Sequence, residues 1–204
     1  MTVSAIAFNC SLKKSSGEPS STDAMIEVLK KKFAARDVTL SETIRVADYN
    51  VLPGVTNDEG EGDDWPQLLE KIKAHDILIF GGPIWMGQIS SIAKRVLERM
   101  DAFLTDTDDK GRMPSYGKVA VAAIVGNEDG AHWSSSQLFQ ALNDTGWTIP
   151  SVAACYWVGE AMHGTDFKDL DKTPEKVDQT AGMVADNAAH LARLLKDNPY
   201  PGHE

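Results

Sequence analysis

Short apolar runs alternate with amphipathic segments along the whole of this 204-residue sequence. The runs of strand length span residues 3–8, 39–46, 76–80, 118–125 and 149–158. The third and fourth contain ILIF and VAVAAIV, which are almost continuously apolar, as is typical of strands covered on both faces in a parallel sheet. Strand–helix alternation with short connections therefore predicts an α/β fold, a doubly wound five-stranded parallel sheet in a three-layer α/β/α arrangement.

Helical patterns fill the intervals between these runs. One expected helix has Thr22 as its N-cap, another begins at about Gln88, and a third begins near Ser134. The last opens with TPEK, so that Thr173 is the expected N-cap. No internal repeat or low-complexity linker interrupts the pattern, and 42% hydrophobic residues can bury a sizeable core. We therefore expect a single domain that spans residues 1–204.

The charge and the cysteines exclude several classes of protein. A formal net charge of −10 argues against a nucleic-acid surface. The two cysteines, Cys10 and Cys155, share no CxxC spacing, so we expect buried thiols rather than disulfides or zinc ligands. No run approaches the about 20 apolar residues of a membrane helix, and no secretory signal is visible. The sequence predicts a cytoplasmic protein without metal, nucleic-acid partner or membrane insertion.

The loop after the first run, NCSLKKSSGEPSST, lies where an open α/β sheet binds its ligands. A dinucleotide fingerprint would need several glycines, and this loop has only Gly17. A nucleoside-triphosphate loop fails at GGPIWMGQ, where Gln88 takes the place of the required lysine. A low-molecular-weight phosphatase loop would follow Cys10 with an arginine six positions on, where Ser16 stands instead. None of these three phosphate loops matches.

What remains is a hydroxyl-rich loop that leads into a helix N-terminus. Hydroxyl groups and the unpaired amides of a first helical turn can hold a phosphate monoester, and Lys13 or Lys14 can add positive charge. An ordinary serine-rich turn in front of a capped helix is the alternative, and the loop by itself does not decide between them. The hydroxyl-bearing residues are Ser11, Ser15, Ser16, Ser20, Ser21 and Thr22.

Two further loops follow the third and fourth runs at the same edge of the expected sheet. In the first, we expect the strand to end at Gly81–Pro83, which leaves Trp85 and Met86 in an exposed loop. The second, GNEDG, is rich in backbone donors. A phosphate cradle, an aromatic side chain and a donor-rich loop together suit a planar phosphorylated ring such as FMN, which flavodoxin-type sheets bind at this position.

These motifs resemble those of the flavodoxin-like NAD(P)H-dependent FMN reductases and quinone reductases. The likeness spans residues 3–158 and is carried by NCSLKKSSGEPSST, GGPIWMGQISSIAKRVLERMD and GNEDG. It departs from the family in its longer first loop, in the large Trp85 and in an added loop at 159–173. The resemblance implies that the phosphate is contacted by Ser11, Lys13, Ser21 and Thr22. It implies that the ring is contacted by Pro83, Ile84, Trp85, Met86 and Gly87. The implied contacts with the pyrimidine edge come from Gly126, Asn127, Asp129 and Gly130.

The same resemblance implies an FMN-dependent oxidoreductase that passes hydride from NADPH or NADH to FMN and on to a quinone or similar small acceptor. No catalytic side chain is required, although His132 is a candidate hydrogen-bond donor to the flavin or substrate. Related reductases assemble as homodimers or homotetramers, and the added loop and the tail NPYPGHE support this expectation here. Two alternatives stay open, a flavodoxin-type electron carrier without nicotinamide turnover and a flavin-free interaction module.

Overall fold

The computed structural model describes residues 2–161 and 163–202. Within them, five parallel strands form a sheet in the order β2–β1–β3–β5–β6, and the short β4 pairs antiparallel with β3. This is the strand order of flavodoxin-like doubly wound sheets, as the sequence predicts. The strands are β1 (Val3–Asn9), β2 (Val38–Arg45), β3 (Ile77–Trp85), β4 (Gln88–Ile89), β5 (Val119–Gly126) and β6 (Ala154–Val158).

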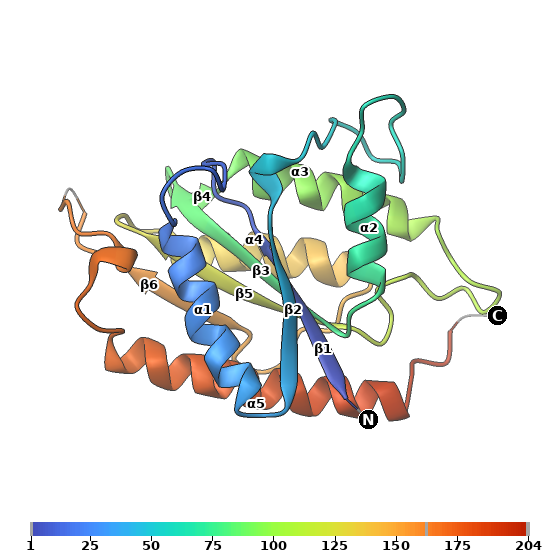
Figure 1. Cartoon of the computed structure of the whole chain (residues 1–204). Coiled ribbons are helices and arrows are strands. Elements are labelled where there is room, and N and C mark those ends of the chain that lie inside the picture. The colour runs from blue at the N-terminus through green and yellow to red at the C-terminus, as the bar shows by residue number, and fades with distance from the viewer. Residues whose placement is uncertain (1, 162, 203–204) are drawn as a thin grey trace.

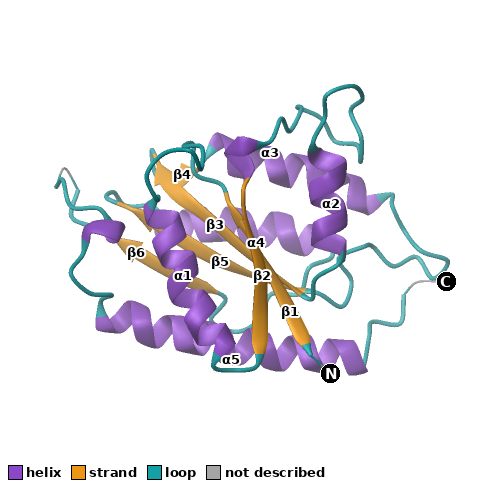
Figure 2. Cartoon of the chain, viewed as in Figure 1, coloured by secondary structure: helices purple, strands orange, loops and turns teal. Residues whose placement is uncertain are grey.

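The principal helices cover both faces of the sheet, so the fold has three layers (Figures 1 and 2). Successive side chains of a strand point to opposite faces, and β1 therefore contributes Ile6 and Phe8 to one core and Ala5 and Ala7 to the other. The first core lies under α2, α3 and α4, and the second under α1 and α5. These helices are α1 (Ser21–Ala34), α2 (Trp65–Lys73), α3 (Ser91–Met100), α4 (Ala131–Asp144) and α5 (Glu175–Asp197).

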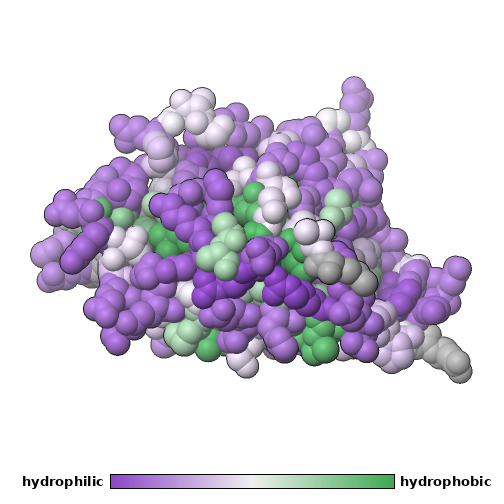
Figure 3. Space-filling view, turned by 60° about the horizontal axis from the view of Figure 1, so that its bottom comes forward, coloured by the Kyte–Doolittle hydropathy of each residue, from purple (hydrophilic) through white to green (hydrophobic). Residues whose placement is uncertain are grey.

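The outer surface near α5 is largely polar. Figure 3 shows the side that carries this helix, where hydrophilic residues dominate and hydrophobic ones occur in separate groups. The inward face of α5 is built from small residues such as Ala181, Ala185 and Ala188, which are buried and let the helix approach the sheet closely. Among the described residues, no helix has the length and apolar character needed to cross a bilayer.

The third strand differs from the prediction. We expected Gly81–Pro83 to end it, which is wrong, because β3 continues to Trp85 and Pro83 pairs in register with Val125 of β5. Beyond Gly81 the strand no longer has β1 as a neighbour, and a proline is tolerated where a strand has a partner on one side only. Gly81 has a packing role, since an added Cβ would lie 2.9 Å from atoms of α1. Trp85 is therefore held by a sheet rather than by a free loop.

Two N-cap residues also differ from the prediction. Ser20, not Thr22, caps α1, because the Ser20 Oγ accepts a hydrogen bond from the Asp23 amide at 3.1 Å. The Asp23 side chain in return accepts one from the Ser20 amide at 2.7 Å, which completes a capping box. At α5 the N-cap is Pro174 rather than Thr173.

Three other element boundaries shift as well. The helix expected from Gln88 begins at Ser91, since Gln88 belongs to β4, and the Ser90 Oγ accepts its N-terminal hydrogen bond from the Ala93 amide at 3.1 Å. The helix expected near Ser134 begins earlier, at residue 131. The strand β6 begins at residue 154 instead of 149.

Candidate functional site

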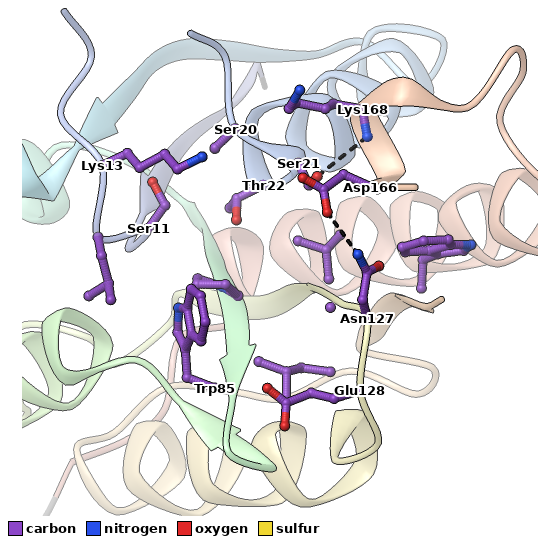
Figure 4. Close-up of a pocket in the computed structure, with 16 residues that line it drawn as sticks. Ser11, Lys13, Ser20, Ser21, Thr22, Trp85, Asn127, Glu128, Asp166 and Lys168 are labelled. Atoms are coloured by element: carbon purple, nitrogen blue, oxygen red, sulfur yellow. Dashed lines mark hydrogen bonds between the residues drawn. The ribbon is translucent and has the colours of Figure 1, made fainter. Parts of the chain in front are cut away.

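A cavity of about 320 Å³ lies at the carboxyl ends of β1, β3 and β5. It sits beside the point where the chain leaves β1 and β3 in opposite directions along the sheet, the usual ligand position in this fold. Figure 4 shows the hydroxyl-bearing residues of the first loop and α1 at one end, and Trp85 and Glu128 at the other. The residues predicted from sequence that line it are Ser11, Lys13, Ser21, Thr22, Pro83, Ile84, Trp85, Gly126 and Asn127.

The hydroxyl end of the cavity combines a helix N-terminus with a buried hydroxyl group. The first-turn amides of Ser21 and Thr22 have no carbonyl within α1 to bond. Ser11 is only 5% exposed, and its Oγ has no hydrogen-bond partner within the described chain. A buried hydroxyl beside open amides is a costly arrangement unless a ligand uses it. This end can therefore bind an anion, with Lys13 at its rim.

A buried polar network fixes the first loop. The Asn9 Oδ1 accepts a hydrogen bond from the Ser11 amide at 2.9 Å, and its Nδ2 donates to the Asp23 carboxylate. Arg45, at the end of β2, donates to the carbonyl of Lys13 at 2.7 Å and forms an ion pair with Asp23. These contacts connect three separate segments and hold the first loop in place at the cavity.

The opposite end of the cavity is apolar and aromatic. Trp85 is 52% exposed, so one side of the indole is open to solvent. Gly126 permits close packing there, because an added Cβ would lie 2.8 Å from the Cβ of Ile84. Such an end offers a flat surface to a planar ring.

Two residues of the segment 159–173, which follows β6, form part of one side of the cavity, namely Asp166 and Lys168. Asn127 Nδ2 donates to the Asp166 carboxylate at 2.8 Å, and the Lys168 amide donates to the Ser21 Oγ at 3.4 Å (Figure 4). Phe167, between them, is buried with its ring 5.6 Å from that of Trp157. The sequence left the role of this segment open, and the structure makes it part of the wall. Met162 of this segment lies outside the described residues.

Several residues of the wall were missed by the sequence reasoning. Asp166 and Lys168 carried no periodic signal, because their place depends on how an irregular segment folds back. Trp157 both packs against the second core and lines the cavity. Glu128 lines the cavity, whereas its predicted neighbour Asp129 does not. Their adjacency in GNEDG allowed no choice between the two from sequence.

Some predicted contacts do not lie on the wall. Met86, Gly87, Asp129 and Gly130 belong to the neighbouring loops but are not part of the cavity lining. His132 lies outside it too, where its Nε2 is 2.9 Å from the Tyr156 hydroxyl. Their suggested contacts with a ligand stay predictions.

Both cysteines are buried, as the sequence predicts. Burial raises the pKa of the Cys155 thiol to about 12, and it raises that of Cys10 as well. Neither side chain is therefore a reactive thiolate near neutral pH. In the part of the chain that the structure describes, no three His, Cys, Asp or Glu side chains lie together in a way that could hold a metal ion.

Known proteins similar to this chain include a family and two curated relatives. The sequence model of the family described as NADPH-dependent FMN reductase matches residues 3–161. The 8-demethyl-8-aminoriboflavin-5'-phosphate synthase of Streptomyces davaonensis is 32% identical over 211 residues, covering 98% of this chain and 81% of that protein. The divalent metal cation transporter MntH of Mycobacterium bovis is 33% identical over 199 residues, covering 94% of this chain. The chain spans only 29% of that relative's length.

Solved structures agree on the fold. RosB with bound 8-demethyl-8-formylriboflavin-5'-phosphate has a TM-score of 0.87 and 29% identity, covering 98% of this chain and 82% of its own. The apo form of the NADH:FMN oxidoreductase EMOB has a TM-score of 0.67 and 18% identity, covering 99% and 95%. A flavodoxin from the domain Archaea has a TM-score of 0.59 and 11% identity, covering 94% and 99%. The last two support the flavodoxin-like fold alone.

Proposed function

Because this chain belongs to the NADPH-dependent FMN reductase family, we propose that its cavity binds FMN with the phosphate at α1 and the ring beside Trp85. As a member of the family, it is an NAD(P)H-dependent flavin oxidoreductase with FMN as cofactor. The observation that carries the placement is the buried, unpartnered Oγ of Ser11 beside the open amides of α1. A phosphate oxygen would accept the hydrogen bond that this hydroxyl does not otherwise donate.

The residues at the hydroxyl end suit a phosphate monoester. Ser11, Ser21 and Thr22 supply hydroxyl donors, and the N-terminus of α1 favours negative charge. Lys13 adds an ammonium group, which acts as a point charge and tolerates several phosphate orientations. In this proposal these four side chains hold the phosphate, and Arg45 fixes the loop from below.

The residues at the apolar end suit the flavin ring. Pro83, Ile84 and Trp85 present side chains from β3, while Gly126 and Asn127 bring backbone from the end of β5. Met86 and Gly87 stay candidate contacts with the ring, and Asp129 and Gly130 stay candidate contacts with its pyrimidine edge, through the loops that flank the cavity. Bound FMN supplies the hydride and electron transfer chemistry of the reaction.

The protein's own residues then orient the flavin ring and shield it from solvent. Trp85 leaves one side of the ring end open, where a nicotinamide and afterwards a small acceptor such as a quinone can stack in turn. Asp166 and Lys168 bound another side of the cavity, and the buried Phe167 between them anchors this part of the chain. His132 is not part of the cavity lining, which favours a reaction without proton transfer by that side chain.

The remaining parts of the proposal concern the whole protein. We propose a single-domain cytoplasmic enzyme that assembles as a homodimer or homotetramer. Exposed apolar side chains support assembly, notably those of Met86 and Trp133. Two buried free thiols support a reducing compartment such as the cytoplasm. The tail NPYPGHE was the other reason to expect assembly, and its last two residues lie outside the described residues.

The decisive test is reduction of the reconstituted protein under anaerobic conditions. The purified chain is loaded with FMN, freed of excess flavin and mixed with NADPH or NADH. We expect the flavin absorbance to bleach and to return when a benzoquinone is added. A protein that binds FMN but is not bleached by either nucleotide would contradict the reductase proposal and support a carrier. A protein that takes up no FMN would contradict the placement of the cofactor.

A second function is favoured by the full-length similarity to a flavin-modifying enzyme. The Streptomyces davaonensis relative is a synthase of an aminated riboflavin-5'-phosphate, and it is similar over 98% of this chain, beyond the family match that ends at residue 161. The same cavity would then hold riboflavin-5'-phosphate as a substrate. Mass spectrometry of flavin recovered after aerobic incubation with an amine donor distinguishes the two, since a pure reductase returns FMN of unchanged mass.

A further inference from the structure

The turn between β3 and β4 has an uncommon backbone conformation. Met86 and Gly87 both have positive φ angles, 53° and 74°. Amides of successive residues in such a turn point to the same side and form a concave site for an anion. Here the anion is the carboxylate of Glu128, whose Oε1 accepts from the Met86 amide at 3.0 Å and whose Oε2 accepts from the Gly87 amide at 3.1 Å.

This contact joins two loops that are 41 residues or more apart in the sequence. A second contact reinforces it, because a Cβ added to Gly130 would lie 2.6 Å from the Cα of Gly87. Glycine at position 130 therefore lets the two backbones touch. The Met86 side chain is 88% exposed and packs little, so the turn depends on these polar and backbone contacts.

The cavity thus has an anion-binding feature at each end. At the hydroxyl end the amides of α1 are open, whereas at the ring end the amides of the β3–β4 turn are already bonded to Glu128. Glu128 also places a negative charge on the cavity wall near Trp85 (Figure 4). Of these two sets of amides, only that of α1 is therefore open to a phosphate.

We infer that Glu128 is a positioning residue that locks the hairpin carrying Trp85 onto the loop after β5 and gives the flavin one orientation. The inference rests on the proposed flavin site for its ligand, but the lock itself is present in the chain. A hairpin that is already ordered costs less conformational entropy when the ring binds. Charge-assisted bonds to two adjacent amides are strong enough to provide this order.

The test compares Glu128→Ala and Glu128→Gln with Glu160→Gln as a control for lost charge. Glu160 is a 75% exposed carboxylate outside the cavity lining, so its substitution is expected to change nothing measured here. Amide hydrogen exchange, resolved by NMR in the flavin-free protein, should speed up by about tenfold or more at Met86 and Gly87 in Glu128→Ala. Unchanged exchange at these two amides would overturn the lock.

Binding titrations test the consequence for the ligand. We expect Glu128→Ala to weaken FMN and riboflavin by the same factor, about tenfold, because the lock acts on the ring end. Glu128→Gln, which retains one acceptor oxygen, should lie between the wild type and Glu128→Ala. Equal FMN affinity in all variants, or a loss confined to FMN, would overturn the positioning role. If the wild type itself binds no flavin, the proposed function fails, and exchange still decides the lock.

Discussion

The guanidinium of Arg45 at the end of β2 forms an ion pair with the carboxylate of Asp23 in the first turn of α1. Arg45 is only 8% exposed and also donates to the carbonyl of Lys13 at 2.7 Å. One buried cation therefore ties the first loop to the helix whose N-terminus faces the cavity. Because its charge is neutralised by Asp23, Arg45 serves the proposed phosphate site by holding the loop and the helix together.

Substitution of Arg45 should weaken the binding of FMN more than the binding of riboflavin. We expect Arg45→Met to weaken FMN by about tenfold or more and riboflavin much less, because it releases the loop and leaves the Asp23 carboxylate unpaired in the first turn of α1. Fluorescence titration with both flavins measures the ratio. Arg45→Lys keeps the charge and should recover part of the FMN affinity, which distinguishes this effect from general unfolding. Equal losses for both flavins would contradict the assignment.

Ser11→Ala should affect stability and binding in opposite directions. The Ser11 Oγ is buried without a partner, so its removal should leave the free energy of unfolding unchanged or slightly raised. FMN affinity should fall by about 1 kcal/mol, or about fivefold, because one donor to the phosphate is lost. Urea unfolding of the flavin-free protein and FMN titration check the two parts. A loss of stability without a loss of affinity would mean that the hydroxyl is structural.

Trp85→Ala should reduce flavin affinity with little cost to the fold. The indole is half exposed, so its removal takes away little buried area, whereas a stacked ring loses contact area and favourable π geometry. We expect FMN to bind about tenfold more weakly. Trp133→Ala is the matched control, since Trp133 is also exposed but does not line the cavity. Similar losses in both variants would argue against ring contact at Trp85.

Asp166→Ala should detach the segment 159–173 from the loop after β5. Its carboxylate accepts the hydrogen bond of the Asn127 amide group at 2.8 Å, and the loss of such a bond costs about 1.5–3 kcal/mol. We expect faster proteolysis within the segment and weaker FMN binding. Asp166→Asn keeps an acceptor oxygen and should behave nearly as the wild type. Asp171→Ala, in the same segment but off the cavity wall, is the control.

The buried pair of Asp63 and Arg99 should make stability depend on pH. Both side chains are 0% exposed, and Arg99 also binds the carbonyls of Leu52 and Thr56. Burial by itself raises the pKa of Asp63, but the hydrogen bonds from Arg99 and from backbone amides outweigh it and hold that pKa well below the ordinary value. The stabilisation is therefore complete above pH about 4 and is lost as the pH falls through the lowered pKa.

Asp63→Asn tests this dependence. It leaves the buried guanidinium without its counter-charge, and we expect it to lower the free energy of unfolding by about 3–5 kcal/mol at neutral pH. Below pH about 4 the difference from the wild type should shrink, because Asp63 of the unfolded chain takes up a proton there while the native carboxylate is still ionised. Denaturant unfolding at a series of pH values measures both. A difference that stays constant down to pH about 2 would contradict the assigned ionisation.

Much of the architecture could be predicted because it depends on spacing along the chain. The continuous apolar run of β5 requires cover on both faces, and the periodic stripes of α3 and α5 supply it. The carboxyl ends of parallel strands meet at one edge, so the loops near Ser11, Trp85 and Asn127 were expected to converge, and all three lie on one cavity. Periodicity can be read from the sequence alone, and general rules of sheet topology then predict where the loops meet.

The rest was decided by tertiary contacts between segments of irregular backbone. Whether Glu128 or Asp129 faces the cavity depends on the positive φ angles of a turn some forty residues earlier. β3 continues past Gly81 because it still pairs with β5 where its pairing with β1 has ended. The position of Asp166 depends on its hydrogen bond with the side-chain amide of Asn127, which lies in another loop. The sequence alone therefore determined the layers and the edge at which a ligand binds, because strand and helix periods choose faces. Only the tertiary structure decided which side chains form the wall, because loops without a period are positioned by the partners they meet.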